Sequence, residues 1–282
     1  MISPLVSTDW LAEHLHDASL RIIDIRGHVL PASEPHPHYF SHRAEYLESH
    51  IEGALFVDWT SDIVEPDSIS VDIANPERFA DFMSSLGIDS STTVVAYDDA
   101  NGMFAARMWW ALRYYGHDAV YVLNGGWQNW LAEGRHITAE IPSVERTNFV
   151  PMLMPELSKS ADEILANLTE KRFQLVDVRK SHEFMGKSSR AKRLGHIPDA
   201  LNIPRAELVA KDGTLLPADE LSQIFKKAGL HLDTGNEIVI YCNGGVSASY
   251  GLLALNTLGF TNASVYDGSW KDWGNDDSKP IA

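Results

Sequence analysis

The chain has 282 residues, of which 44% are hydrophobic and 22% charged, a composition typical of a globular protein large enough for two domains. Its net charge of −16 argues against binding to nucleic acids or anionic membranes, and its single cysteine excludes an internal disulfide, a multi-cysteine zinc site and a Cys-x-x-Cys pair. The N-terminus lacks signal-peptide features and no apolar run has the length of a membrane span, so a reducing compartment, most simply the cytoplasm, is expected.

Strand and helix patterns alternate along the chain, and the same alternation occurs twice. Strands are predicted in the first half at 20–25, 93–97 and 119–123, with helices at 76–86 and 103–115. Strands are predicted in the second half at 174–178, 237–241 and 263–266, with helices at 218–228 and 248–258. A glycine follows each helix, as at a C-terminal cap. This alternation predicts an α/β fold in which helices flank parallel sheets.

Four sequence blocks return in the same order about 150 residues later, which indicates a duplicated domain. The paired blocks are 20–26 and 173–179, 49–55 and 195–201, 93–98 and 237–242, and 124–130 and 267–273. A proline-containing stretch without periodicity separates the copies and is expected to be an extended linker. The predicted division is a first domain at 1–138, a linker at 139–158 and a second domain at 159–282.

Cys242 follows a predicted strand and opens a loop of small residues that leads into a predicted helix. Backbone N–H groups and the helix dipole gather at such a point and lower the pKa of a cysteine, which favours the reactive thiolate. The alternative is a buried cysteine that serves as a small hydrophobic residue. With no second thiol in the chain, chemistry at Cys242 requires a partner from outside. Five loop residues are expected to cradle an anion with their N–H groups: Asn243, Gly244, Gly245, Val246 and Ser247. Ser247 is also a candidate N-cap.

The repeated blocks resemble those of the rhodanese family of tandem-domain sulfurtransferases. The segments 50–54 (His-Ile-Glu-Gly-Ala) and 196–200 (His-Ile-Pro-Asp-Ala) are similar to the family's H-I-P-G-A block, and 266–270 is similar to its Y-D-G-S-W block. The resemblance implies two tandem rhodanese-like domains with the active site at their interface. The first is expected to be inactive, because Asp98 stands where the second has Cys242.

The resemblance implies that Cys242 takes a sulfane sulfur from a small anionic donor, becomes a persulfide and passes the sulfur to a thiol or to cyanide. No cofactor and no metal are implied. Thiosulfate is the favoured donor and 3-mercaptopyruvate the alternative. Arg190 and Arg193 are the candidate donor-binding residues, although their basic segment alone also fits a solvated loop. Glu183 stands where related enzymes carry a donor-binding arginine, so the donor stays open.

Other paired residues are expected to be structural. His50 and His196 belong to repeated blocks, and whether His50 reaches the active site is left open. The pairs Asp24–Arg26 and Asp177–Arg179 are predicted to be structural ion pairs, because both halves carry them. The prolines among the histidines at 36, 38 and 42 argue against a metal site.

Two other functions compete with that of a sulfurtransferase that acts on small molecules. A phosphatase or arsenate reductase of this fold needs an arginine six residues after the cysteine, where this chain has Ala248. A sulfur-delivery module that loads a protein acceptor would use the same persulfide, and this alternative stays open.

Overall fold

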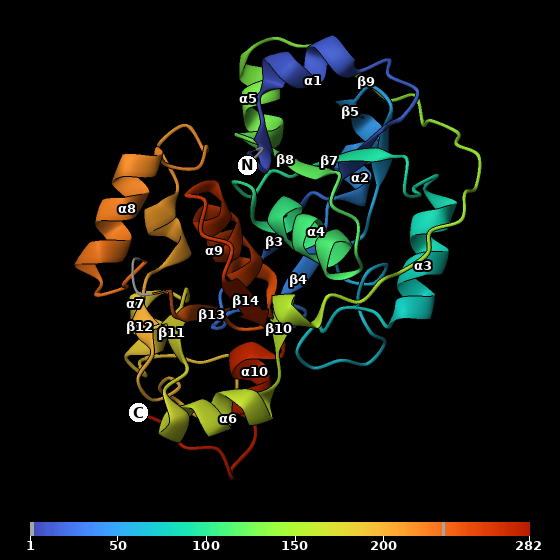
Figure 1. Cartoon of the computed structure of the whole chain (residues 1–282). Coiled ribbons are helices and arrows are strands. Elements are labelled where there is room, and N and C mark those ends of the chain that lie inside the picture. The colour runs from blue at the N-terminus through green and yellow to red at the C-terminus, as the bar shows by residue number, and fades with distance from the viewer. Residues whose placement is uncertain (1–2, 233–234) are drawn as a thin grey trace.

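The computed structural model describes residues 3–232 and 235–282, and within them the chain forms two five-stranded sheets whose strands all pair in parallel (Figure 1). The first sheet has the order β1-β8-β7-β2-β6 and comprises β1 (Leu5–Val6), β2 (Leu20–Asp24), β6 (Ala54–Phe56), β7 (Thr93–Tyr97) and β8 (Val120–Leu123). The second has the equivalent order β10-β14-β13-β11-β12 and comprises β10 (Ser158–Lys159), β11 (Phe173–Asp177), β12 (Leu201–Asn202), β13 (Glu237–Tyr241) and β14 (Ala263–Tyr266). The predicted α/β fold is confirmed.

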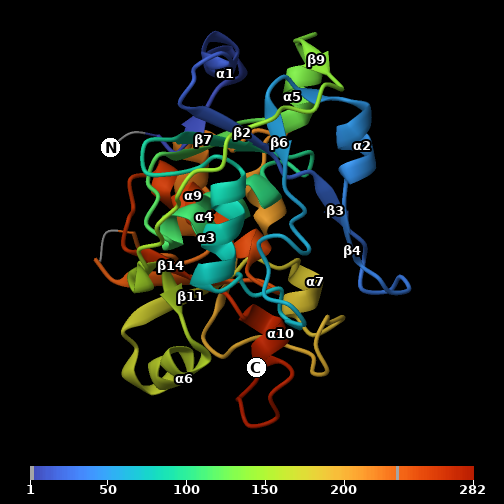
Figure 2. The same cartoon turned by 90° about the vertical axis from the view of Figure 1, so that its right-hand side faces the viewer.

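Two short antiparallel pairs lie outside these sheets in the N-terminal half. They are β3 (Gly27–Val29) with β4 (Tyr39–Ser41), and β5 (His50–Ile51) with β9 (Ile137–Thr138). The β3–β4 hairpin projects from the N-terminal half toward α7 of the C-terminal half (Figure 2). The hairpin therefore brings the chain around position 30 to the second domain.

The helices follow the same duplicated order. In the N-terminal half they are α1 (Thr8–His14), α2 (Arg43–Glu48), α3 (Pro76–Ser85), α4 (Met103–Tyr114) and α5 (Gly126–Ala132). In the C-terminal half they are α6 (Ala161–Glu170), α7 (Ser181–Phe184), α8 (Ala218–Lys227), α9 (Val246–Thr257) and α10 (Ser269–Trp273), with short 3₁₀ helices at Pro155–Leu157 and Arg205–Leu208. Among the described residues, no helix has the length and apolar character needed to cross a membrane.

The two halves share one apolar core, which is centred on α4 and α9 (Figure 1). Both helices are buried along most of their length, so each packs against its own sheet on one side and against the other helix on another. Their N-termini also meet, since the Ser247 hydroxyl contacts the Met103 sulfur at 3.2 Å. The carboxyl ends of β7 and β13, and the loops that follow them, are therefore held close to the boundary between the halves.

Candidate active site

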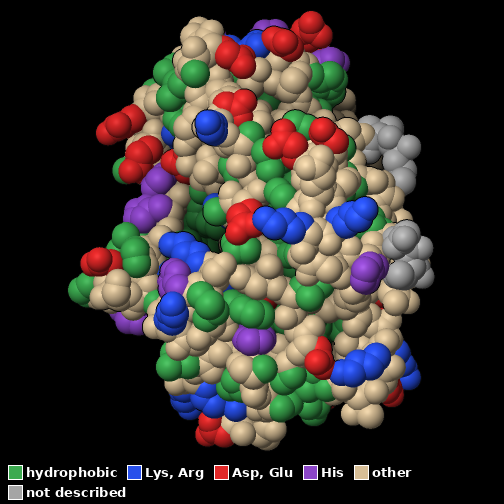
Figure 3. All heavy atoms as spheres, turned by 90° about the vertical axis from the view of Figure 1, so that its left-hand side faces the viewer, with side chains coloured by type: hydrophobic (Ala, Val, Ile, Leu, Met, Phe, Trp, Pro, Cys, Tyr) green, Lys and Arg blue, Asp and Glu red, His purple; other side chains and the backbone are tan. Residues whose placement is uncertain are grey.

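Cys242 directly follows β13 and lies at a cavity of about 470 Å³ that is lined by both halves of the chain. The cysteine is only 4% exposed, so the cavity is its route to solutes. On the face shown in Figure 3 the surface is hollowed, and side chains of both charges border the hollow, with His, Lys and Arg on one side and an acidic side chain on the other. The position follows the general rule that ligands of α/β sheets bind at the carboxyl ends of the strands.

The Ser269 side chain holds the cysteine loop in place. Its hydroxyl oxygen accepts hydrogen bonds from the N–H groups of Cys242 and Gly245, each at 3.1 Å, and donates to the Tyr266 carbonyl at 2.7 Å. The Trp270 N–H then donates to the Cys242 carbonyl at 3.0 Å. The segment after β14 therefore sets the position of the cysteine loop.

Two of the five predicted cradle groups already have acceptors within the protein. The Gly245 N–H is bound to Ser269, and the Val246 N–H donates to the Gly244 carbonyl at 2.9 Å. These two N–H groups are not available to a bound anion, which corrects that part of the prediction. The proposed second role of Ser247 is also wrong, because α9 begins at Val246 and Gly245 takes the N-cap position.

Four N–H groups at the loop have no acceptor among the described residues. They belong to Asn243, Gly244, Ser247 and Ala248. Unpaired N–H groups at the start of a helix are the usual donors to bound anions. Ala248 was missed as a donor because its place in the first turn of the helix depends on where α9 begins.

The N-terminal half shows what the equivalent loop does with a negative charge. The fully buried Asp98 carboxylate accepts four backbone hydrogen bonds of 2.6 to 2.8 Å. Its donors are Ala100, Gly102, Phe104 and Ala105. The last two occupy the second and third positions of α4, as Ser247 and Ala248 do in α9. The duplicated loop is thus built to surround an anion, and in this half a tethered carboxylate fills it.

The loop glycines allow the N-terminal half to close over the site. A Cβ atom on Gly244 would lie 2.2 Å from the Ser70 carbonyl oxygen, so only glycine fits beneath that segment. Gly245 has φ +74°, a backbone conformation that other residues rarely adopt. An ion pair between Arg107 of α4 and Asp267 joins the halves beside this loop. The site therefore lies at the domain interface.

A family described as “Rhodanese-like domain” matches residues 7–133 and, a second time, residues 160–276. The chain belongs to the rhodanese-like family. The double match confirms the resemblance that was inferred from the repeated blocks.

Relatives cover almost the whole chain. The sulfur carrier protein TtuD of Thermus thermophilus is 36% identical over 99% of this chain and 96% of its own length. Thiosulfate sulfurtransferase of Mus musculus is 36% identical over 95% of this chain and 91% of its own length. The crystal structure of SseA from Escherichia coli, a 3-mercaptopyruvate sulfotransferase, superposes with a TM-score of 0.84 at 34% identity and covers 95% of this chain and 99% of its own. These similarities support a sulfurtransferase with a sulfur donor and a sulfur acceptor as substrates.

The two candidate arginines of this rhodanese-like protein have different surroundings. Arg190 lines the cavity together with Cys242, donates to the Leu30 carbonyl, and lies 3.4 Å from His38 Nδ1. Arg193 is not among the residues that line this cavity. Its guanidinium instead donates to carbonyls of the C-terminal tail, at 2.8 Å for Trp273 and 2.7 Å for Lys279. The structure therefore retains Arg190 and removes Arg193 from the candidate site.

Glu183 forms part of the cavity wall beside Cys242. It is 8% exposed, and its Oε1 accepts a hydrogen bond from Asn243 Nδ2 at 2.9 Å. The Asn243 Oδ1 is buried without a partner among the described residues. The site thus presents a carboxylate and an amide oxygen beside Cys242.

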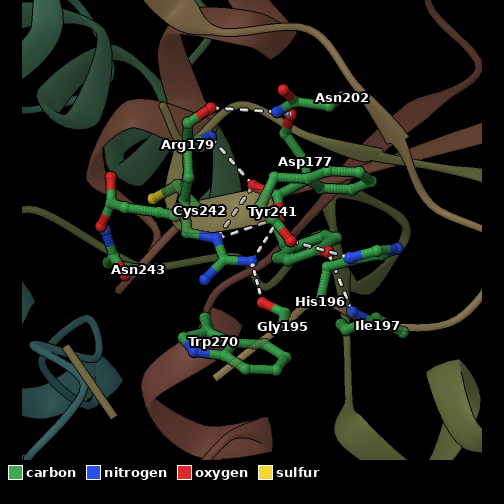
Figure 4. Close-up of polar contacts among 12 residues, drawn as sticks. Asp177, Arg179, Gly195, His196, Ile197, Asn202, Tyr241, Cys242, Asn243 and Trp270 are labelled. Atoms are coloured by element: carbon green, nitrogen blue, oxygen red, sulfur yellow. Dashed lines mark hydrogen bonds and ion pairs between the residues drawn. The ribbon is translucent and has the colours of Figure 1, made fainter. Parts of the chain in front are cut away.

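Arg179 also lines the cavity, but most of its polar atoms serve the fold (Figure 4). It forms a buried ion pair with Asp177 at 2.6 Å, donates to the Gly195 carbonyl at 2.9 Å and lies over the Trp270 ring at 4.5 Å. Tyr241 completes this cluster, and burial raises the pKa of its phenol well above the ordinary value, so the phenol stays neutral. The Asp24–Arg26 pair repeats the arrangement at 2.9 Å, which confirms the structural assignment of both pairs.

The two block histidines have structural hydrogen bonds. His50 is fully buried, with Nδ1 2.7 Å from the Tyr46 carbonyl and Nε2 3.1 Å from the Glu140 carbonyl. His196 Nδ1 lies 2.9 Å from the Phe184 carbonyl. Neither histidine lines the cavity with Cys242, which answers the question about His50.

Two further cations lie near Cys242, and no local sequence pattern predicts either of them. Arg205 lines the cavity, and burial lowers the pKa of its guanidinium. Lys271 lies just after the loop's anchor, and its pKa falls from the ordinary 10.5 to about 8, chiefly through burial and then through repulsion from Arg190. The electrostatic attraction of Cys242 raises the pKa of both groups in opposition to burial. Both positive charges are thus electrostatically linked to the cysteine.

The N-terminal half adds a polar wall to the same cavity. His42 Nδ1 lies 2.6 Å from Asp99 Oδ2, and its Nε2 lies 2.7 Å from His28 Nδ1. Asp99, His42 and His28 all line the cavity. Among the described residues, no group of three or more His, Cys, Asp or Glu side chains has an arrangement that would hold a metal ion.

Proposed function

We propose that this protein moves sulfane sulfur through a persulfide on Cys242, from thiosulfate to a thiol or cyanide. The Cys242 thiolate attacks the outer sulfur of thiosulfate, the S–S bond breaks, and sulfite leaves with the bonding electron pair. The acceptor thiolate or cyanide then attacks the terminal sulfur of the persulfide, and the cysteine leaves as a thiolate. The two steps form a ping-pong cycle without a cofactor.

One observation carries this proposal. Four N–H groups of the loop after β13 have no acceptor within residues 3–232 and 235–282, and the equivalent loop after β7 surrounds the Asp98 carboxylate with the same kind of donors. A persulfide is an anion, and such donors stabilise it. The proposed cradle comprises the N–H groups of Asn243, Gly244, Ser247 and Ala248.

The proposed donor site lies on the cationic side of the cavity. Arg190 and Arg205 line the cavity with Cys242, and neither pairs with a carboxylate among the described residues. They supply local positive charge in a protein whose net charge is −16. Thiosulfate is proposed as the donor because thiosulfate sulfurtransferase of Mus musculus is 36% identical over 95% of this chain, and 3-mercaptopyruvate is the alternative.

Mass spectrometry of the intact protein tests the proposal. Incubation with thiosulfate is expected to add one sulfur atom to the protein, and peptide mapping is expected to place it on Cys242. The same treatment of Cys242→Ser is expected to add none. Equal sulfur uptake by both proteins, or uptake by neither with thiosulfate or 3-mercaptopyruvate, contradicts the proposal. Faster loading by 3-mercaptopyruvate reverses only the choice of donor.

Delivery of sulfur to a protein is the second candidate function. It is favoured by the 36% identity to the sulfur carrier protein TtuD over 99% of this chain. The persulfide protein, freed of donor, separates the two acceptor classes. Rapid discharge to a protein thiol with only slow discharge to cyanide supports delivery, and the reverse order supports transfer to small molecules. Either outcome suits a reducing compartment, where a lone thiol stays reduced.

A further inference from the structure

Lys271 is a buried lysine that has no acidic partner in the part of the chain that the structure describes. It is 8% exposed, its Nζ donates to the Ile69 carbonyl at 2.9 Å, and it lies 4.3 Å above the Tyr39 ring. Within residues 3–232 and 235–282, no carboxylate comes within ion-pair distance of it. Lys279 provides the contrast, since it is 9% exposed, lies over the Trp273 ring and pairs with Asp162 at 3.2 Å.

A second cation without a carboxylate lies beside the first. The Arg190 guanidinium is 5.8 Å from the centre of the same Tyr39 ring, and in the described part of the chain its contacts are the Leu30 carbonyl and His38. Repulsion between the two is already visible in the lowered pKa of Lys271, after the larger effect of burial. Two like charges held together in this way destabilise the fold unless something compensates them.

A separate small cavity of about 170 Å³ lies where these two cations meet. Its walls contain four basic side chains and no carboxylate: His36, His38, Arg190 and Lys271, with Ala32, Tyr39, Ser189 and Ala191 completing them. Cys242 does not line this cavity, although Tyr39 and Arg190 line both it and the larger one. We call it the basic side pocket.

Ser189 adds a directed donor. Its Oγ accepts hydrogen bonds from Trp270 Nε1 at 2.9 Å and from the Ala191 N–H at 3.0 Å. Because both bonds are made to the oxygen, the hydroxyl hydrogen remains free to donate. The pocket therefore offers hydrogen-bond donors of three kinds, namely an ammonium, a guanidinium and a hydroxyl.

We propose that the basic side pocket binds a small dianionic oxyanion of the sulfite or sulfate type. A volume of about 170 Å³ accommodates such an ion with a few waters, at roughly 30 Å³ per water, but not a nucleotide. The bound anion compensates both unpaired cations and accepts the available hydrogen bonds. The identification of sulfite as the natural ligand rests on the proposed function, in which sulfite is released beside Cys242. Arg190 borders both cavities and so connects the place of release with the basic side pocket. Binding of an oxyanion does not depend on sulfur transfer.

Calorimetric titration of the Cys242→Ala protein with sulfite, and separately with sulfate, tests the proposal, because neither anion can react there with a persulfide. We expect one site for each anion. Lys271→Met in the same background should weaken binding at least about tenfold, as expected for loss of a charged hydrogen bond. Lys279→Met should leave the affinity unchanged. Absence of binding, or equal affinity in Lys271→Met, overturns the proposal.

Two further variants locate the bound anion. Arg205→Met alters the Cys242 cavity but not the basic side pocket. If Arg205→Met weakens binding and Lys271→Met does not, the anion lies beside Cys242 and the proposal is wrong. Lys271→Arg preserves the positive charge and is expected to keep most of the affinity for the anion. If Lys271→Met folds poorly, loss of anion binding in Lys271→Arg contradicts the proposal. Persulfide formation by the unsubstituted protein without anion binding refutes this inference alone, whereas anion binding without persulfide formation refutes the proposed function alone.

Discussion

Replacing Lys271 with methionine is expected to stabilise the protein at pH 7. The pKa of Lys271 falls from 10.5 to about 8 in the folded chain, and each pH unit corresponds to about 1.4 kcal/mol, so its charged form costs ~3 kcal/mol. Methionine keeps the length and packing of the side chain but gives up the hydrogen bond to the Ile69 carbonyl, worth about 1 kcal/mol. The net gain in the free energy of unfolding is therefore about 2 kcal/mol.

The pH dependence of this gain identifies its cause. The unfolded chain binds the Lys271 proton more readily than the folded chain, so the penalty is fully present below pH 8 and disappears as the pH rises to 10.5. The advantage of Lys271→Met should shrink across that window. Arg190, Tyr39, Cys242 and Asp72 act on this lysine, and the Cys242→Ala background removes one of these four influences.

Urea denaturation at several pH values, in sulfate-free buffer, measures the effect. Lys279→Met is the matched control, and because Lys279 is paired with Asp162 we expect it to lose stability by no more than about 1 kcal/mol. Added sulfate should stabilise the unsubstituted protein more than Lys271→Met. If Lys271→Met is less stable than the unsubstituted protein at pH 7, or if the difference does not change with pH, the lysine is not an uncompensated buried charge.

Three further predictions concern the donor site and the paired loop. Arg190→Met should raise the KM for thiosulfate roughly tenfold while Arg193→Met leaves it unchanged, and equal increases would return Arg193 to the site. Glu183→Gln removes a negative charge from the cavity wall and should lower the same KM severalfold at low ionic strength, whereas an unchanged KM would mean that the carboxylate does not face the donor. Asp98→Ala leaves four backbone N–H groups unpaired and should lower the free energy of unfolding by about 3 kcal/mol without reducing sulfur loading of Cys242, and a loss below about 1 kcal/mol would contradict the role given to this carboxylate.

The sequence predicts the inner strands β7 and β13 well because each contains four consecutive apolar residues, all of which are buried. It does not reveal the edge strands β1 and β10, since two residues cannot show a period and each forms only by pairing with a distant strand. The cysteine loop was predictable because strand, small residues and helix are contiguous. The precise donors were not, since they depend on the residue at which α9 begins.

Arg190 and Arg193 show where such prediction ends. They lie three residues apart in one basic segment, and nothing local distinguishes them. Their destinations depend on partners far along the chain, the β3–β4 hairpin for Arg190 and the C-terminal tail for Arg193. Lys271 presents the same difficulty, because its burial depends on Ile69 and Tyr39 of the other half.

The half that lacks a cysteine is therefore part of the site rather than a relic of duplication. It supplies the Ser70–Val71 segment above Gly244, the polar wall of Asp99 and His42, and the Tyr39 ring that Arg190 and Lys271 share. A tethered carboxylate in its own loop keeps that half folded without chemistry, because Asp98 satisfies the N–H groups that a persulfide would otherwise need. One loop holds the fixed Asp98 carboxylate, and the other presents N–H groups beside Cys242, so the duplication assigns closure of the cavity to one half and sulfur transfer to the other. The C-terminal half alone would retain Cys242, its cradle, Arg190 and Arg205, but it would lose the part of the cavity wall that the N-terminal half supplies.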